Sequence, residues 1–242
     1  MAEKTRMTPE WIRRVWADNP CTVLSNGNVR TGPVRLGFVN ILQRPKPGAD
    51  GKERAYGAVL LFPDLALIGG QAALAPLQQA VIAQFKENAP VALQNQAMLS
   101  KYHNPFKKQD TFVDLSTGEI YDGFAEGRIC ISANSSRSQP GCFDINQAPI
   151  TDKSRCYSGA WAIAALRPDW INRDEKKGPT FYLQSVMVVA DDENLGGAGP
   201  SNPSVDFGGV KIDPTVNPAG MFGDTGHTAG GPAAEPAIDL FA

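Results

Sequence analysis

Two apolar runs set the fold: YSGAWAIAALR at residues 157–167 and PTFYLQSVMVVA at residues 179–190. Each has the length and composition of a β-strand. In the first run, Tyr157, Trp161, Ile163 and Arg167 share one side, whereas Ala160, Ala162, Ala164 and Leu166 share the other. Successive strand residues point to opposite faces of a sheet, so large aromatics and a guanidinium are predicted to stand together. The side with small residues is expected to be the closely packed one.

A third run, GRICISANS at residues 127–135, has the alternation of a half-buried strand. Its apolar positions are Ile129, Ile131 and Ala133, and they alternate with Arg128, Cys130, Ser132 and Asn134. One face is therefore predicted to lie on a core, and the face that carries Arg128 is predicted to face water.

Upstream of these runs, the sequence predicts a hairpin and two helices. The strand-like runs at 34–42 and 54–62 flank QRPKPGADGKE at 43–53, whose Pro, Gly and Asp residues indicate a long loop with a basic tip. Residues 72–88 have apolar residues at helical spacing. A short amphipathic helix is predicted within residues 8–19, with Thr8 as its N-cap and Pro9 at its first position.

The predicted order is strand, strand, helix, strand, strand, strand. Five strands with one inserted helix suit a small barrel of the OB kind, closed or partly open. The fold class is therefore predicted to be mainly β, an OB-fold-like five-stranded barrel with an inserted helix and an added C-terminal tail.

Length and composition limit the kinds of protein that this chain can be. The chain has 242 residues, of which 42% are hydrophobic and 20% charged, which is enough for one core. We expect a folded domain over residues 1–195 and a flexible tail over 196–242. No apolar run has the roughly 18 residues of a membrane span, and no secretory signal is expected. Four scattered cysteines and two distant histidines argue against a zinc site or a disulfide scaffold.

The net charge of −2 conceals an uneven distribution. Residues 191–242 contain eight acids and one base, Lys211, so they carry −7. The remaining residues contain 22 bases and 17 acids and carry +5. A basic body joined to an acidic tail is compatible with a polyanionic partner, although the acids could also serve only to keep a terminus soluble.

Residues 157–208 also contain a recognisable series of motifs. A Y-x-G strand start, a polar loop, a KG turn, an aromatic-bearing strand, an acidic D-x-E-x-LGG exit and an acidic stretch with Phe follow one another. They fall on Tyr157 with Gly159, Lys177 with Gly178, Phe181, residues 191–197, and Asp206 with Phe207. Together with KYHNPFKK at 101–108 and ANSSRSQP at 133–140, the series resembles a family of phage single-stranded DNA-binding proteins with an OB fold, once catalogued only as a domain of unknown function. The Ala-rich strand and the long tail after Phe207 depart from the family pattern.

The resemblance implies a protein without catalytic residues, metal or cofactor that coats and protects single-stranded DNA in phage replication or recombination, in the cytoplasm of the infected bacterium. Bases stack on aromatic side chains, at roughly 1–3 kcal/mol per base, and Lys or Arg contacts with phosphates release counterions. The candidate DNA-binding residues are aromatics interleaved with bases: Tyr102, Phe106, Lys107, Lys108, Arg128, Arg137, Arg155, Tyr157, Trp161, Arg167, Trp170 and Lys177. A core position for Trp161 and a hydrogen-bonded strand end for Tyr157 are the alternatives.

The tail ends in EPAIDLFA at residues 235–242, which places apolar residues among acids. We expect the acidic tail to compete with DNA for a cationic groove. The released tip would then present Glu235, Ile238, Asp239, Leu240 and Phe241 to replication partners such as a polymerase or a helicase. No membrane partner is expected.

Two other classes of protein fit parts of the sequence. Asp110, Asp114 and Glu119 are close enough in sequence to suggest the Mg²⁺ cluster of a nuclease, but acidic loop residues are usually only solvated. A β-rich body with a Gly/Pro-rich tail also fits a virion or assembly protein that does not bind nucleic acid. Such a protein would need no basic groove.

Overall fold

The computed structural model describes residues 6–48, 51, 53–94, 96–173 and 175–195. The predicted tail over 196–242 lies outside the described residues, and so do its tip residues Glu235, Ile238, Asp239, Leu240 and Phe241.

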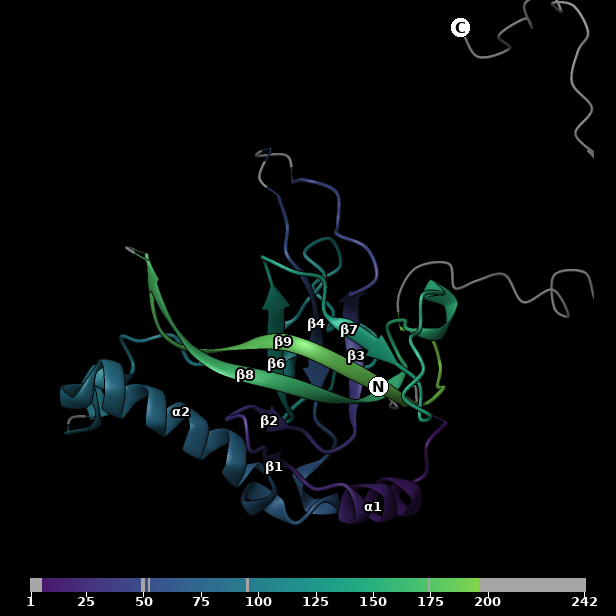
Figure 1. The fold of residues 1–242 in the computed structure, drawn as a ribbon, viewed down its shortest axis with the longest axis horizontal. Helices are drawn as coiled ribbons and strands as arrows, with labels where there is room; N and C mark the ends of the chain where they lie inside the picture. Colours follow the sequence, from purple (N-terminus) through teal and green to yellow (C-terminus); the bar gives the residue numbers. More distant parts are fainter. Residues whose placement is uncertain (1–5, 49–50, 52, 95, 174, 196–242) are drawn as a thin grey trace, which may run out of the picture. The chain divides into compact units, whose positions relative to one another are not determined.

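Five strands form a closed ring (Figure 1). In ring order they are β8 (Trp161–Arg173), β3 (Val34–Asn40), β4 (Tyr56–Leu61), β6 (Ile129–Ser135) and β9 (Lys176–Ala190). β9 pairs with β8 to close the ring. All of these pairings are antiparallel except that of β6 with β9. The helix α2 (Ala75–Asn88) is inserted between β4 and β6, so the predicted order and the mainly β, OB-like class are confirmed.

Short strands extend the ring. β1 (Thr22–Val23) pairs with β2 (Val29–Arg30), and β2 pairs with β8. β5 (Phe106–Lys108) lies along β6, and β7 (Gly141–Phe143) lies parallel to β9. The remaining helical segments are α1 (Pro9–Asp18), α3 (Gln96–Leu99) and the 3₁₀ helices η1 (Leu65–Leu67), η2 (Gly70–Leu74), η3 (Pro90–Gln94), η4 (Gln109–Thr111) and η5 (Lys153–Arg155).

α1 begins and packs as its sequence predicts. The Thr8 hydroxyl accepts a hydrogen bond from the Trp11 backbone N–H at 3.1 Å, which satisfies one of the free donors of the first turn. Ile12 and Trp16 are buried. The Trp16 indole lies so close to Gly32 that a Cβ there would come within 2.8 Å of the ring. Glycine at this position therefore lets the helix approach the strands.

α2 packs along β8 and β9 through Leu77 and Phe85. The predicted helix at 72–88 begins later, at Ala75, because the preceding turn is the 3₁₀ helix η2. In Figure 1, α2 lies along the outer part of the β8–β9 hairpin. There the Phe85 ring meets Tyr102 and Trp170 edge-on, with both centroid distances at 5.6 Å. The helix thus supports the hairpin where it extends beyond the ring.

β8 corrects one prediction. Trp161 and Ile163 were expected on an open side, but β8 is buried on both sides from Trp161 to Ala164. Trp161 is only 1% exposed, because Trp11 of α1 covers it with a T-shaped contact at 5.5 Å. Cys130 on β6 was also expected to face water. It is fully buried with Val59 and Leu61, against Phe112, Phe124 and Leu195.

The residues after Arg167, which were expected to form a polar loop and a KG turn, belong to β-strands instead. β8 continues to Arg173, and Lys177 and Gly178 pair within β9, opposite Asn172 and Ile171. Pro168 is tolerated because this part of β8 pairs with β9 alone. The N–H that proline lacks is therefore not needed for hydrogen bonds to a second neighbouring strand. The two strands form a long hairpin that extends from the ring.

Candidate nucleic-acid interface

A groove runs across the outer face of β6 and β9. It consists of two adjoining cavities of about 380 and 320 Å³, which share Ser136 and Tyr182 as lining residues. The first is lined also by His103, Lys107, Arg173 and Lys176, with Ala55, Ser132, Asn134, Ile171, Thr180 and Phe181. The second is lined also by Arg137, Arg167 and Trp170, with Ser135, Ser138, Asp169 and Gln184. We call the two together the groove.

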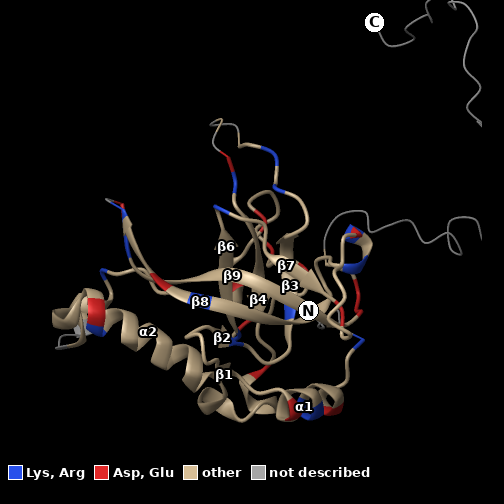
Figure 2. Ribbon diagram, viewed as in Figure 1, with Lys and Arg blue, Asp and Glu red and all other residues tan. Residues whose placement is uncertain are grey.

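The groove is cationic. Among the described residues, its lining contains five basic side chains, Lys107, Arg137, Arg167, Arg173 and Lys176, and one carboxylate, Asp169. Asp169 pairs with Arg167 at 3.2 Å, whereas the other four cations have no carboxylate partner in the described part of the chain. Figure 2 shows Lys and Arg on both strands of the β8–β9 hairpin near its tip and along the β3–β4 loop. Like charges collected in a concave surface attract an anion.

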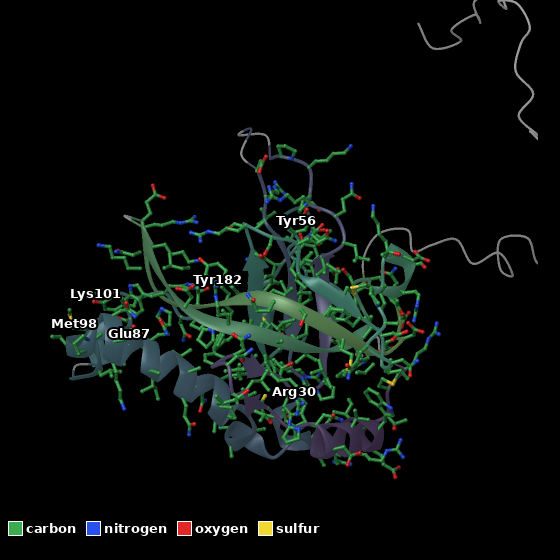
Figure 3. The ribbon with its side chains drawn as sticks, in the orientation of Figure 1. Arg30, Tyr56, Glu87, Met98, Lys101 and Tyr182 are labelled. Atoms are coloured by element: carbon green, nitrogen blue, oxygen red, sulfur yellow. The ribbon has the colours of Figure 1, made fainter. Side chains whose placement is uncertain are left out.

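Tyr182 of β9 lies at the junction of the two cavities, and Figure 3 labels it. The Arg167 guanidinium lies 5.2 Å from the centroid of its ring. Trp170, also half-buried, lines the second cavity while its ring contacts Tyr102 at 5.6 Å. The Tyr182 ring offers a stacking surface beside these phosphate-binding groups, whereas the Trp170 ring packs against Phe85 and Tyr102.

The β3–β4 loop borders the groove. Arg44 donates a hydrogen bond from Nη2 to the carbonyl of Ser136 at 2.6 Å and forms an ion pair with Glu53. Its guanidinium also lies 5.0 Å from the ring centroid of Tyr56, at the start of β4 (Figure 3). These contacts tie the basic loop predicted from sequence to the rim of the groove.

Burial and like charges perturb two groups in the first cavity. The pKa of His103 is lowered to about 4, mainly by burial and then by the nearby charges of Lys176 and Lys107. The pKa of Lys176 is also lowered, by burial and by Lys107 and Arg173. His103 is therefore neutral at pH 7, and the positive charges around it repel one another when no anion is present.

Four of the predicted DNA-binding residues line the groove: Lys107, Arg137, Arg167 and Trp170. Others lie beside it. Tyr102 packs on Trp170, Phe106 contacts the buried Phe181 at 6.4 Å, and Lys108 ends β5. The Lys177 carbonyl accepts a hydrogen bond from the His103 backbone N–H. Arg128 lies just before β6, and its carbonyl accepts a bond from the Gln109 backbone N–H.

Three predicted residues lie elsewhere. Arg155 of η5 pairs with Asp144 at 3.6 Å, and the Tyr157 hydroxyl donates to the Asp192 carbonyl at 2.9 Å. Neither lines the groove. Trp161 was predicted to bind DNA, and that prediction is wrong, because a ring that is 1% exposed has no free face for a base. Its Nε1–H donates to the Asp192 carboxylate at 2.8 Å.

Sequence reasoning missed Tyr182, Arg173, Lys176 and His103 as groove residues. The alternation of β9 could have found Tyr182, because Phe181 and Leu183 are buried on the core face and Tyr182 lies between them. Arg173 and Lys176 could not be found in this way, since the hairpin that pairs them was expected to be a loop.

A second aromatic cluster lies on the outer face of β3, β4 and β6. Phe38, which is 42% exposed, contacts Tyr121 at 5.0 Å, Phe124 at 5.4 Å and Phe112 at 6.3 Å. The Lys107 ammonium lies 5.8 Å from the Phe112 ring. This cluster covers Cys130 and is not part of the groove lining.

The part of the chain that the structure describes contains no group of three His, Cys, Asp or Glu side chains that could hold a metal ion. Asp110, Asp114 and Glu119 accordingly form no such group there. No helix among the described residues is both long and apolar enough to cross a membrane.

Comparisons with known proteins place the chain in a family. Residues 27–215 match the family model described as "Enterobacter phage Enc34, ssDNA-binding protein". No curated protein matches the sequence.

Two solved structures of the bacteriophage Enc34 single-stranded DNA-binding protein share the fold. One, in complex with ssDNA, has 23% sequence identity and a TM-score of 0.56, and the match covers 73% of this chain and 94% of that one. The other, a C-terminal truncation, has 20% identity and a TM-score of 0.52, with 72% and 92% covered. Since the family model spans most of the sequence, the chain belongs to the family of the Enterobacter phage Enc34 ssDNA-binding protein.

Proposed function

We propose that this protein binds single-stranded DNA in the groove and coats it during phage DNA replication or recombination. The observation that carries the proposal is a concave surface whose described lining residues include five cations, the aromatic residues Tyr182 and Trp170, and one carboxylate. Unpaired bases can stack on the Tyr182 ring while the cations contact phosphates. The proposal includes no catalytic step, metal or cofactor.

Family membership supports the proposal, and so does the Enc34 relative, whose structure was solved in complex with ssDNA. The groove itself adds a quantitative expectation. For single strands, the logarithm of the affinity falls with the logarithm of the salt concentration with a slope of about −0.7 per phosphate contacted. Five cations therefore give a slope of about −3.5 at most.

Titration of the full chain with a dT oligonucleotide at several salt concentrations tests the proposal. Arg137→Ala with Lys176→Ala should weaken binding and reduce the slope by about 1.4, because two phosphate contacts are lost. Arg13→Ala with Arg14→Ala, on the exposed face of α1, is the matched control and should leave the slope unchanged. Absence of salt-sensitive binding by the unchanged chain would overturn the proposal and favour a virion or assembly role.

Tryptophan fluorescence gives a reporter within the groove. Of the four tryptophans, Trp16 and Trp161 are buried in the core and Trp11 packs on Trp161, whereas Trp170 lines the groove. We expect most of the quenching by DNA to come from Trp170. Trp170→Phe should therefore remove the signal change while an anisotropy assay still detects binding.

The proposal extends to the tail and to the place of action. The tip residues Glu235, Ile238, Asp239, Leu240 and Phe241 combine apolar side chains with acids, which suits a basic pocket with an apolar centre on a replication protein such as a polymerase or a helicase. The protein would act in the cytoplasm of the infected bacterium. Deletion of residues 235–242 should abolish capture of such a partner while DNA binding stays equal or becomes stronger. Unchanged capture would contradict the role of the tip.

A further inference from the structure

The first cavity of the groove contains an uncharged titratable group, His103, among basic side chains. His103 lies in the loop before β5 and faces Lys107 from β5, Arg173 from β8 and Lys176 from β9. The other described polar side chains that line this cavity are neutral. No hydrogen bond joins the His103 imidazole to another described residue, so the ring is free to engage a ligand.

The position of His103 is fixed by its backbone. Its N–H donates to the Lys177 carbonyl at 2.7 Å, which attaches the loop to the β8–β9 hairpin. Gly178 makes this approach possible, because a Cβ there would lie 2.6 Å from the His103 nitrogen. The imidazole is therefore held in the wall of the cavity, within the charge field of the three cations.

The electrostatics of the cavity keep the imidazole neutral in the free protein. Burial and the charges of Lys176 and Lys107 lower the pKa of His103 to about 4. An anion in the same cavity would reverse the charge contribution, since a phosphate beside the ring favours its protonated form. A protonated imidazole can also donate hydrogen bonds from both of its nitrogens.

We propose that this cavity is a phosphate site in which His103 takes up a proton from solvent when a phosphodiester of single-stranded DNA binds. The inference rests on the proposed function and goes beyond it, because it assigns a phosphate subsite and makes DNA affinity depend on pH. The proton adds to the unprotonated ring nitrogen, and no covalent bond of the DNA is broken.

Calorimetry of the full chain with a dT oligonucleotide tests the proposal. Titrations in two buffers of different ionisation enthalpy, at pH 5.5, 6.5 and 7.5, give the number of protons taken up on binding. We expect uptake of up to one proton per bound site at pH 5.5, and an affinity that rises on acidification by up to about tenfold per pH unit. His103→Gln should abolish the uptake and the pH dependence, whereas the matched control His227→Gln, at the only other histidine, should retain both.

NMR provides a second readout that needs no variant. Since the chain has two histidines, their ring signals can be followed by pH titration with and without the oligonucleotide. We expect one histidine to titrate near pH 4 in the free protein and above about pH 6 in the complex, because a bound phosphate favours the protonated ring.

The outcomes separate the two proposals. DNA binding without proton uptake, or with uptake that persists in His103→Gln, would overturn the phosphate site and leave the proposed function standing. Absence of DNA binding at every pH and salt concentration would overturn both.

Discussion

Asp192, two residues beyond the end of β9, is a buried carboxylate with several partners. Its carboxylate is buried and accepts hydrogen bonds from the Trp161 indole at 2.8 Å and from the Arg6 backbone N–H at 2.6 Å. Arg35, also buried, places its Nε 3.6 Å from the same carboxylate and donates to the carbonyls of Gly159 and Glu193. Asp192 is therefore part of the core, although its place in the sequence groups it with the acids of the tail.

Asp192→Asn should destabilise the fold strongly. Neutralising one member of a buried ion pair leaves the other charge without compensation, which costs about 3 kcal/mol or more. Urea unfolding followed by circular dichroism would measure the loss. Asp191→Asn is the matched control, because Asp191 is exposed and, among the described residues, makes only a long 3.5 Å contact with Tyr157, so its effect should stay within about 0.5 kcal/mol. Equal effects of the two changes would contradict the structural role of Asp192.

His103 makes a prediction for stability that is opposite in sign to the one for binding. Its pKa is about 4 in the folded state and 6.5 in the reference state. Between these values the unfolded chain binds more protons, so folding stability is fully present above pH 6.5 and falls as the pH drops toward 4.

Urea unfolding at pH 7.0 and pH 5.0 tests this dependence in the absence of DNA. The unchanged chain should lose more stability between the two values than His103→Gln does. This window avoids the aspartates Asp144 and Asp152, whose lowered pKa values act only in more acidic solution. The same loss in both proteins would show that the imidazole is not desolvated as the structure has it.

At the scale of elements, the β8–β9 hairpin depends on one close contact. Gly178 has φ +142°, and its missing Cβ makes room for the backbone of His103. On the neighbouring strand, Trp170 packs against Phe85 of α2. The hairpin is thus attached to a loop on one strand and to a helix on the other, and both attachments shape the groove wall.

Gly178→Ala should loosen the hairpin and weaken DNA binding severalfold. A side chain at this φ costs about 1–3 kcal/mol, and here the new Cβ would also meet the His103 backbone. Hydrogen exchange of the His103 amide, which bonds to Lys177, should accelerate by about tenfold or more. Gly118→Ala is the matched control, since Gly118 has φ +72° and open space around it, and it should leave that amide unchanged.

The same hairpin marks the limit of what the sequence could predict. Apolar runs of strand length, alternation and turn residues were sufficient for β3, β4, β6 and the ring portion of β8 and β9, and apolar residues at helical spacing were sufficient for α2. They were insufficient for Pro168–Arg173, whose polar residues form a strand only because β9 pairs with them. That pairing brings the groove cations Arg173 and Lys176 opposite one another. This part of the candidate site therefore could not be predicted from the sequence pattern.

The prediction that Trp161 of β8 would be exposed was wrong for a different reason. The position of Trp161 depends on Trp11 and Asp192, which lie 150 residues before it and 31 after it in the sequence. No local pattern contains such a contact. Tyr182, in contrast, could have been predicted, because strand alternation alone separates it from the buried Phe181 and Leu183.

At the scale of the whole molecule, the boundary between the basic body and the acidic tail lies later than residue 191. The exit of β9 belongs to the body, because the Leu195 N–H donates to the Ser158 carbonyl at 2.8 Å and its side chain packs against the cluster of Val59, Leu61 and Cys130. Residues 196–242 then contain five acids and Lys211, a net −4, and the remainder has 22 bases and 20 acids, a net +2. The body is less basic than a division at residue 191 suggests, so the concentration of cations in the groove is what distinguishes it.

Truncation after Gly197 tests the competition between tail and DNA without damaging the fold, because the cut leaves Asp192 and Leu195 in place. A tethered anionic segment acts at a high effective concentration, so its removal should tighten DNA binding, most strongly at low salt where charge interactions are least screened. A full-length chain with Asp206, Asp213 and Asp224 changed to Asn is the matched control for charge, and it should reproduce most of the gain. Fluorescence titrations at two salt concentrations measure both. Equal affinity of all three proteins at low salt would mean that the tail does not compete for the groove, whereas a gain only on truncation would assign the effect to the length of the tail and not to its acids.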